Sequence, residues 1–309
     1  MWNKLGVIFN VDNRNDWMIS HACVPTAILI NPTTVRIFYS PRNKKGKSIP
    51  TYFDVEASKP SKIKYIHTKP ILDLGELGTF DDDGIMPCSA VRISDNTIYL
   101  YYVGWNPSVS VPYRNAIGLA ISNDNGQTFK KGFQGAIVER NREEPFFTAS
   151  PYVIKENDKW HLWYASSTGF VVVVGKPEPL YEIKYAYSVD GIDWIRPNIT
   201  CIPPLKKYEC TARPTVIKEN GIYKMWFTYR GSFDYRDGAD SYKIGYAESK
   251  DAVNWIRNDE LSGIKLSEEG WDSKMQTYPS VIKLGTKKYL FYNGNGFGKT
   301  GIGLAEWNE

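Results

Sequence analysis

The chain has 309 residues, of which 42% are hydrophobic and 14% aromatic, and its formal net charge is +4. The length is sufficient to bury a large core, and the modest, scattered positive charge does not favour a nucleic-acid partner. No apolar run approaches the roughly 18 residues that a membrane-spanning helix needs, and the N-terminal segment lacks a signal-peptide pattern. The four cysteines lack metal-type spacing, so we expect reduced thiols in a cytoplasmic protein without a nucleic-acid or membrane partner.

The N-terminal residues 1–9 form a strand-like segment that stands before the first of five repeats. Their sequence is similar to the segment 254–257, the fourth strand of a later repeat, and the last repeat ends one strand short. We therefore expect the N-terminal strand to complete the last repeat. Such pairing removes an exposed sheet edge and closes a ring of repeats.

A short pattern then recurs five times, with a small or polar stretch, a proline and a strand-like run. The prolines lie 62, 64, 63 and 65 residues apart, at Pro25, Pro87, Pro151, Pro214 and Pro279. A fixed period of this length, filled with strand-type residues, is typical of a radial or stacked repeat. About five such repeats fit into the chain.

Each repeat contains segments with the alternation of β-strands, separated by turn residues. The predicted strands of the second to fifth repeats include 97–103, 117–122 and 128–130; 151–156, 159–165, 182–188 and 193–196; 215–219, 223–229, 244–249 and 254–257; and 280–284, 288–293 and 301–307. Four antiparallel strands in each of five repeats predict an all-β fold, a five-bladed β-propeller of four-stranded blades. We expect one domain over residues 1–309.

The segment 122–129 fits the S-x-D-x-G-x-T-W/F turn of sialidase-type propellers, and 188–194 and 249–255 are shorter relatives. The aspartates of these turns are expected to cap their own backbone rather than to act in catalysis. The turns join outer strands, away from the axis.

Chemistry is expected at the propeller axis, where the first strand of each repeat begins. Four of the five loops that lead into these strands contain carboxylates, and the fifth contains His21. Fivefold geometry would bring these groups around one funnel. Carboxylates that converge with Trp, Tyr and Arg suit glycosyl transfer, because one protonates the leaving oxygen and a second acts as base or nucleophile. The alternative is that 81–83 are ordinary turn acids and 143–144 belong to a solvated loop.

In its repeat pattern the whole chain resembles the five-bladed propeller superfamily of arabinanases, β-xylosidases, levansucrases, invertases and β-mannoside phosphorylases. The pattern Tyr-Ala-x-Ser-x-Asp-Gly-x-x-Trp occurs at 185–194. Where arabinanases have an Asp-Pro pair in the first blade, this chain has Val24-Pro25, and Ser150-Pro151 stands where invertases have Arg-Asp-Pro. Glu209-Cys210 matches the invertase-type Glu-Cys pair that carries the acid.

From the axial loops and this resemblance we predict a glycoside hydrolase-like enzyme that cleaves a glycosidic linkage between paired carboxylates. Glu209 is assigned as general acid and Asp83 as base or nucleophile, with Glu144 as the rival to Asp83. The predicted substrate-binding residues are His21, Arg213, Tyr278, Trp17, Asp82 and Arg230. The predicted partner is a sugar or oligosaccharide, with or without phosphate, and no cofactor or metal is predicted.

Two alternatives remain open at this point. The first is a phosphorylase, or an enzyme acting on phosphorylated or nucleotide-activated sugars of polysaccharide metabolism, with Arg213, Arg230 and His21 holding the anion. The second is a glycan-binding propeller without catalysis, which the missing aspartate before Pro25 favours.

Overall fold

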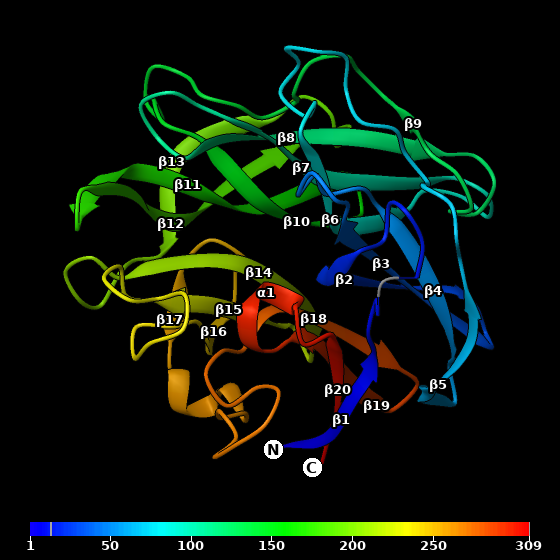
Figure 1. Ribbon diagram of the computed structural model, residues 1–309. Coiled ribbons are helices and arrows are strands. Elements are labelled where there is room, and N and C mark those ends of the chain that lie inside the picture. Colours follow the sequence, from blue (N-terminus) through cyan, green and yellow to red (C-terminus); the bar gives the residue numbers. More distant parts are fainter. Residues whose placement is uncertain (13, 309) are drawn as a thin grey trace.

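The computed structural model describes residues 1–12 and 14–308. Five four-stranded antiparallel sheets are arranged around a central axis, which confirms the predicted all-β, five-bladed propeller (Figure 1). Within the described residues, helical structure is limited to the 3-10 helix η1 (Asp259–Ser262) and the short helix α1 (Asn295–Gly298).

The blades follow one another along the sequence, and the first strands of neighbouring blades contact each other around the axis. The first three blades are β2 (Ser20–Asn31), β3 (Thr34–Arg42), β4 (Thr51–Glu56) and β5 (Lys59–Ile66); β6 (Gly84–Arg92), β7 (Ile98–Pro107), β8 (Tyr113–Ser122) and β9 (Lys130–Lys131); and β10 (Thr148–Glu156), β11 (Lys159–Val173), β12 (Lys176–Ser188) and β13 (Ile195–Ile202). The last two blades are β14 (Cys210–Glu219), β15 (Ile222–Arg230), β16 (Lys243–Ser249) and β17 (Trp255–Arg257); and β18 (Thr277–Leu284), β19 (Lys287–Asn293), β20 (Ile302–Trp307) and β1 (Trp2–Phe9).

The ring closes as predicted, because β1 pairs antiparallel with β20 and becomes the outer strand of the last blade. The amide of Trp2 donates to the carbonyl oxygen of Gly263 at 2.9 Å. The Trp2 ring packs edge-on against Trp226 and Trp307, with centroids 5.7 and 5.1 Å away. The last blade is therefore formed from both ends of the sequence, which lie side by side in Figure 1.

The hydrophobic core lies between neighbouring blades, whose sheets pack face to face. Phe38 and Tyr52 of the first blade belong to one cluster with Leu100 and Tyr102 of the second. Because both faces of an inner strand are covered, β3 is buried along almost its whole length, whereas the outer strand β5 is largely exposed. The aromatic, β-branched composition of the strands suits this packing.

The turn aspartates have the structural role predicted from the sequence. Asp124 accepts hydrogen bonds from the hydroxyl of Ser122 at 2.7 Å and from the amides of Gln127 and Thr128 at 3.0 Å. Asp190 and Asp251 repeat the arrangement in the next two blades. Hydrogen bonds from the backbone amides lower the pKa of Asp190 and Asp251.

All four cysteines are free and buried. Across residues 1–12 and 14–308, no helix has the length and apolar character needed to cross a membrane.

Candidate functional site

The first strand of each blade carries a bulge close to the axis. In four blades the residue before the repeated proline has a positive φ, which is 58° at Val24, 50° at Ser150, 50° at Arg213 and 54° at Tyr278. The pairing register shifts at the same places, and in the second blade it shifts at Cys88. Positive φ is costly for these residue types, and bulges commonly re-aim a side chain at a functional site.

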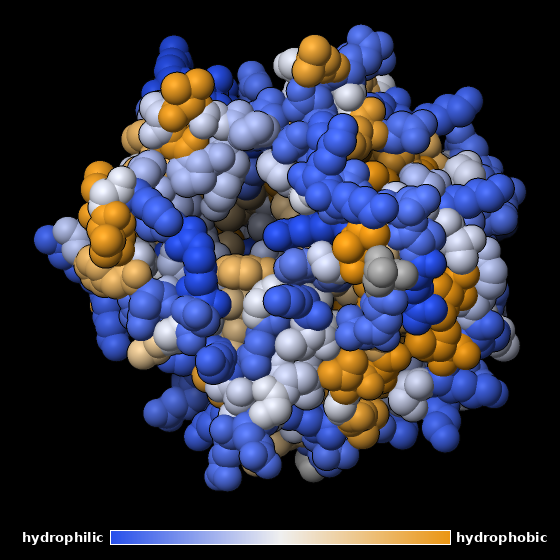
Figure 2. All heavy atoms as spheres, in the orientation of Figure 1, coloured by the Kyte–Doolittle hydropathy of each residue, from blue (hydrophilic) through white to orange (hydrophobic). Residues whose placement is uncertain are grey.

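These five bulged residues all line one cavity, which we call the axial pocket. Figure 2 shows it as the hollow at the centre of this face. Its volume is about 400 Å³, within the range of small-molecule sites. Eight aromatic residues line it, namely Trp105, Tyr113, Phe147, Tyr181, Tyr235, Tyr242, Tyr278 and Phe297. The repeated proline pattern therefore marks the floor of a pocket that offers flat apolar faces together with hydroxyl groups.

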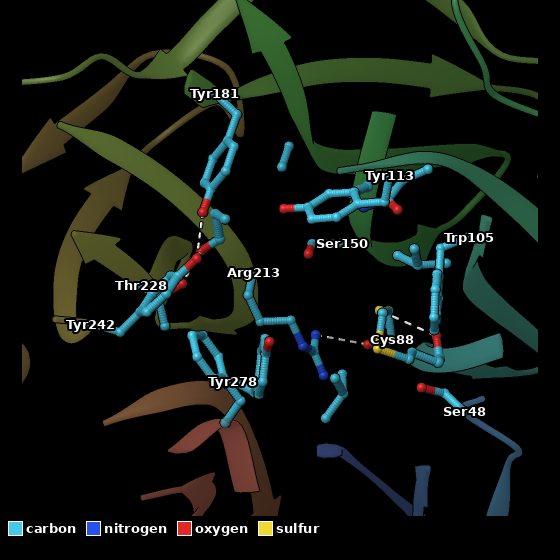
Figure 3. A pocket seen from close by; sticks show the side chains of 18 of the residues that line it. Ser48, Cys88, Trp105, Tyr113, Ser150, Tyr181, Arg213, Thr228, Tyr242 and Tyr278 are labelled. Atoms are coloured by element: carbon cyan, nitrogen blue, oxygen red, sulfur yellow. Dashed lines mark hydrogen bonds between the residues drawn. The ribbon is translucent and has the colours of Figure 1, made fainter. Parts of the chain in front are cut away.

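Arg213 crosses the pocket floor and joins three blades (Figure 3). Its Nη1 donates to the Cys88 carbonyl at 2.8 Å, and its Nη2 donates to the Pro25 carbonyl at 3.0 Å and the Thr26 hydroxyl at 3.1 Å. The side chain is only 1% exposed, its Nε has no hydrogen-bond partner, and no described carboxylate pairs with it. Burial lowers the pKa of Arg213, because a desolvated charge without an opposite charge is unfavourable.

A second buried arginine, Arg230, lies behind the pocket wall. Its Nε donates to the hydroxyls of Tyr181 at 2.8 Å and Tyr242 at 3.2 Å, and its guanidinium lies 3.9 Å from the ring centroid of Tyr235. The hydroxyls of Tyr181 and Tyr242 are also hydrogen-bonded to each other. No ion pair between Arg230 and a carboxylate is present in the described part of the protein. Arg230 thus holds three tyrosines of the wall in place.

Two more arginines, Arg42 and Arg236, line the pocket. Arg236 forms a bidentate ion pair with Glu178, at 2.7 and 3.0 Å, and Tyr235 donates to the same carboxylate at 2.7 Å. Burial alone would raise the pKa of Glu178, but these hydrogen bonds outweigh it and lower that pKa. Arg42 has no ion pair with a described residue, and its Nε is buried without a partner. Among the described lining residues there are three arginines and no Asp or Glu, and of the three only Arg236 has a carboxylate partner among the described residues.

The carboxylates of the loops before the first strands do not line the pocket and have a repeated structural role. In three blades a carboxylate of the loop before the first strand accepts a hydrogen bond from a tyrosine of the second strand and pairs with a cation of the outermost strand. We call these triads the loop brackets: Asp81 with Tyr102 (2.9 Å) and Lys131 (2.7 Å), Glu144 with Tyr164 (2.9 Å) and Arg196 (3.5 Å), and Asp272 with Tyr292 (2.9 Å) and Lys4 (2.7 Å).

The other two blades carry variants of the bracket. In the fourth blade, Glu209 pairs with Arg257 of the outermost strand at 2.8 Å and also accepts the amide of Leu205 at 2.7 Å. In the first blade the acid is replaced by Met18, whose sulfur lies 3.7 Å from the hydroxyl of Tyr39. The brackets therefore hold the loops that lead into the first strands against the outermost strands. The acid side chains of these loops are directed away from the axis.

The structure does not bring the three predicted catalytic carboxylates together. Glu209 and Glu144 sit in their brackets and are not among the residues lining the pocket. Asp83 pairs with Lys47 at 2.9 Å and is 26% exposed. Neither Asp83 nor Lys47 lines the pocket, although the two sequence neighbours of Lys47, Gly46 and Ser48, do. The catalytic roles of all three stay predictions.

The predicted binding residues divide into two groups. Arg213 and Tyr278 line the pocket, and Arg230 supports its wall. The other three, which are Trp17, Asp82 and His21, do not line it: Trp17 packs against the first-blade core, and Asp82 accepts the amide of Gly78 at 2.8 Å. His21 is bonded to the Ser20 hydroxyl through Nδ1 at 2.8 Å. Burial, together with the charges of Arg42 and Lys299, lowers the pKa of His21 to about 4.

Sequence reasoning missed the pocket residues that come from loops between the second and third strands. Arg42 and Ser48 flank the β3–β4 loop, Trp105 and Tyr113 the β7–β8 loop, and Tyr235, Arg236 and Tyr242 belong to the region between β15 and β16. The sequence signal that could locate the pocket was the residue before each repeated proline, because these residues lie at the pocket floor. Within residues 1–12 and 14–308, no group of three or more His, Cys, Asp and Glu side chains is arranged to hold a metal ion.

Solved structures of similar fold are glycoside hydrolase propellers. One, described as a glycoside hydrolase, has a TM-score of 0.74 and 14% identity, with 99% of this protein and 91% of that one covered. A family-43 glycoside hydrolase described as thermostable has a TM-score of 0.63 and 15% identity, with 94% and 90% covered. A structure from the family of mannoside phosphorylases that "contains glycoside hydrolases that target beta-1,2 mannosidic linkages in Candida mannan" has a TM-score of 0.62 and 16% identity, with 94% and 85% covered. The fold is thus glycoside hydrolase-like.

No protein-family model matches the sequence, so the family is defined by individual relatives. Two proteins of Mycobacterium tuberculosis, described as uncharacterized and from strains CDC 1551 / Oshkosh and H37Rv, are each 35% identical over 305 residues, with 98% of both sequences covered. The protein belongs to the family of these mycobacterial proteins. A 1,2-beta-oligomannan phosphorylase of Thermoanaerobacter sp. (strain X514) is 30% identical over 147 residues, which is 47% of this protein and 45% of that one.

Proposed function

We propose that this protein is a carbohydrate-active enzyme with a glycoside hydrolase-like fold. It acts in the axial pocket on a sugar substrate, with phosphate bound in the same pocket. The observation that carries the proposal is the charge of the pocket. Arg42, Arg213 and Arg236 line it, and none of the described lining residues is a carboxylate.

An anion in this pocket would offset an electrostatic cost that the protein alone leaves uncompensated. A buried guanidinium without a counter-charge costs on the order of several kcal/mol. Arg213 is such a group, and Arg42 adds a second cation without an ion pair to the same pocket. Guanidinium groups match phosphate oxygens in geometry and form charge-assisted hydrogen bonds with them. The aromatic walls would receive the apolar faces of the sugar ring.

Phosphorolysis fits a pocket without a carboxylate pair. In hydrolysis of the retaining or inverting type, two protein carboxylates share the work. In phosphorolysis, phosphate attacks the anomeric carbon, the bond from that carbon to the bridging oxygen breaks, and the leaving sugar takes a proton. The protein then has to supply at most one acid. Asp83 is our candidate for this proton donor. The similarity to a 1,2-beta-oligomannan phosphorylase supports phosphorolysis as the reaction.

The test combines binding and turnover. Phosphate, mannose 1-phosphate and glucose 1-phosphate are titrated calorimetrically, and a panel of oligosaccharides that includes β-1,2-mannobiose is assayed for sugar 1-phosphate release. Arg42→Gln should weaken binding of the phosphate compounds at least tenfold, since a charge-assisted hydrogen bond contributes about 1.5–3 kcal/mol. Arg142→Gln is the matched control, because Arg142 is 93% exposed and does not line the pocket. Absence of affinity for every phosphate compound would rule the proposal out.

Asp83→Asn separates binding from chemistry. It should abolish turnover while phosphate affinity stays within about twofold. A second candidate function, glycan binding without catalysis, is favoured by the ion pairs that occupy all three predicted catalytic carboxylates, Glu209, Glu144 and Asp83. Wild-type protein that binds sugar phosphates and turns over no member of the panel would support this candidate instead.

A further inference from the structure

A second cavity adjoins the axial pocket at its rim. Its volume is about 370 Å³, and it lies between residues 108–112 of the β7–β8 loop and residues 176–178 at the start of β12. We call it the rim cleft. Arg236 lines both the rim cleft and the axial pocket, so the two spaces meet at this side chain.

The rim cleft offers groups that suit hydroxyls and short apolar faces. Ser108 and Ser110 provide hydroxyls, and the Arg236–Glu178 ion pair provides a charged donor and acceptor. Val109 and Pro112 provide apolar surface. The described lining of the cleft contains no aromatic ring on which a nucleobase could stack. Lys176 adds a second cation to the lining. The hydroxyls and short apolar faces suit a sugar ring, and the cleft lacks the stacking surface that a nucleobase would need.

The junction between the two cavities is fixed before any ligand binds. Glu178 is only 4% exposed, and it is held by Arg236 through two hydrogen bonds and by the hydroxyl of Tyr235. Tyr235 in turn lies against the guanidinium of Arg230. The ion pair therefore gives Arg236, whose side chain is 57% exposed, a defined position at the junction of the two cavities. Such preorganisation reduces the entropy lost on binding.

We infer that the rim cleft binds the second sugar ring of an oligosaccharide whose terminal ring occupies the axial pocket. This inference rests on the proposed function and deepens it, because it makes the substrate an oligosaccharide rather than a single sugar or a nucleotide-activated sugar. Arg236 contacts both rings and determines the geometry of the linkage between them.

The test fills the rim cleft without touching the axial pocket. Ser110 is exposed on its loop, so Ser110→Trp adds a bulky ring to the cleft at little risk to folding. Leu77→Trp is the matched control, because Leu77 is 100% exposed on another loop and lines neither cavity. The probes are fluorescently labelled β-1,2-linked mannose oligomers and β-linked glucose, galactose and xylose oligomers of one to four units, together with mannose 1-phosphate and GDP-mannose.

For the oligomer series that binds, wild-type affinity should rise at least tenfold between one and two units. Ser110→Trp should remove this gain and leave the affinity for one unit and for mannose 1-phosphate unchanged, while Leu77→Trp behaves as wild type. A two-unit ligand that gains nothing, or a gain that survives Ser110→Trp, overturns the inference and leaves the proposed function standing. A gain for GDP-mannose over mannose 1-phosphate that Ser110→Trp removes assigns the cleft to a nucleotide and overturns it as well. If neither sugar phosphates nor any oligomer binds, the proposed function fails and the inference falls with it.

Discussion

Arg213 performs two tasks at the scale of one residue. Its guanidinium joins carbonyl groups of the first and second blades to the fourth, and the residue also lines the pocket. Each hydrogen bond from a charged donor contributes about 1.5–3 kcal/mol to stability. The same side chain therefore holds the axis together and gives the pocket its positive charge. The positive φ of Arg213 is a local cost that this double role explains.

His21 should make folding sensitive to mild acid. Its pKa is lowered to about 4, whereas an unperturbed histidine has a pKa of 6.5, so the unfolded state binds a proton in this interval that the folded protein does not. The contribution of His21 to the free energy of unfolding is thus fully present above pH 6.5, and it is lost as the pH decreases towards 4. We expect about 1–2 kcal/mol from this partly exposed group, after allowance for solvent screening.

The measurement is urea denaturation between pH 7 and pH 4, with His21→Asn as the comparison. Asparagine tolerates the positive φ of 62° at this position and does not titrate. The variant should lose less stability than wild type over this interval. Parallel pH curves for the two proteins would contradict the prediction.

Single residues of the site were only partly predictable from the sequence. Arg213 and Tyr278 could be placed near the axis because each stands directly before a repeated proline. Arg42 and Arg236 could not, since they reach the pocket through the conformation of loops whose sequences show no repeat. The same holds for His21, whose pKa is lowered first by burial and then by the charges of Arg42 and Lys299, two residues far apart in the sequence.

At the scale of an element, the loop brackets explain why acids recur before the first strands. Each acid joins a loop to a tyrosine of the second strand and a cation of the outermost strand, as Glu144 does with Tyr164 and Arg196. Sequence reasoning directed these acids into the funnel because they precede the prolines. The partner cation lies tens of residues away, so the true direction of the side chain was not visible in the local pattern.

The bracket of the third blade gives a test that also addresses the catalytic role predicted for Glu144. Glu144→Gln should lower the free energy of unfolding by about 1–3 kcal/mol, because a buried ion pair and a charged hydrogen bond are weakened. Glu143→Gln is the control. Its side chain is 61% exposed, and we expect a change within about 0.5 kcal/mol.

Chemical denaturation measures the stability of both variants, and the binding of mannose 1-phosphate is measured in parallel. Glu144→Gln should leave the affinity unchanged. Unaltered stability combined with lost turnover would instead assign Glu144 to catalysis.

At the scale of the whole molecule, the ring depends on the pairing of β1 with β20. Trp2 is buried at this seam between Trp226 and Trp307, whereas Leu5 of the same strand is 42% exposed. Trp2→Ala should cost about 3–5 kcal/mol of stability, as large aromatic truncations in a core do. Leu5→Ala should cost far less. Urea unfolding of both variants is the measurement, and equally small losses would show that the seam is not essential.

The architecture was more predictable than the site. The spacing of Pro25, Pro87, Pro151, Pro214 and Pro279 indicates the number of blades, and the strand segments between them follow from alternation and turn residues. Closure by β1 followed from a missing strand in the last repeat. These features repeat, so each is observed several times in one sequence. The residues of the pocket walls do not recur from blade to blade, so each of them is observed once in the sequence.

The five bulges at the axis have a consequence for how such a ring can change over time. Val24, Cys88, Ser150, Arg213 and Tyr278 project from positions where strand pairing is interrupted, and all five line the pocket. Val24, Cys88 and Tyr278 also pack in one hydrophobic cluster drawn from all five blades, and Arg213 bonds to two other blades. The hub is thus shared by the blades, so a substitution that changes its chemistry also changes contacts that join the ring.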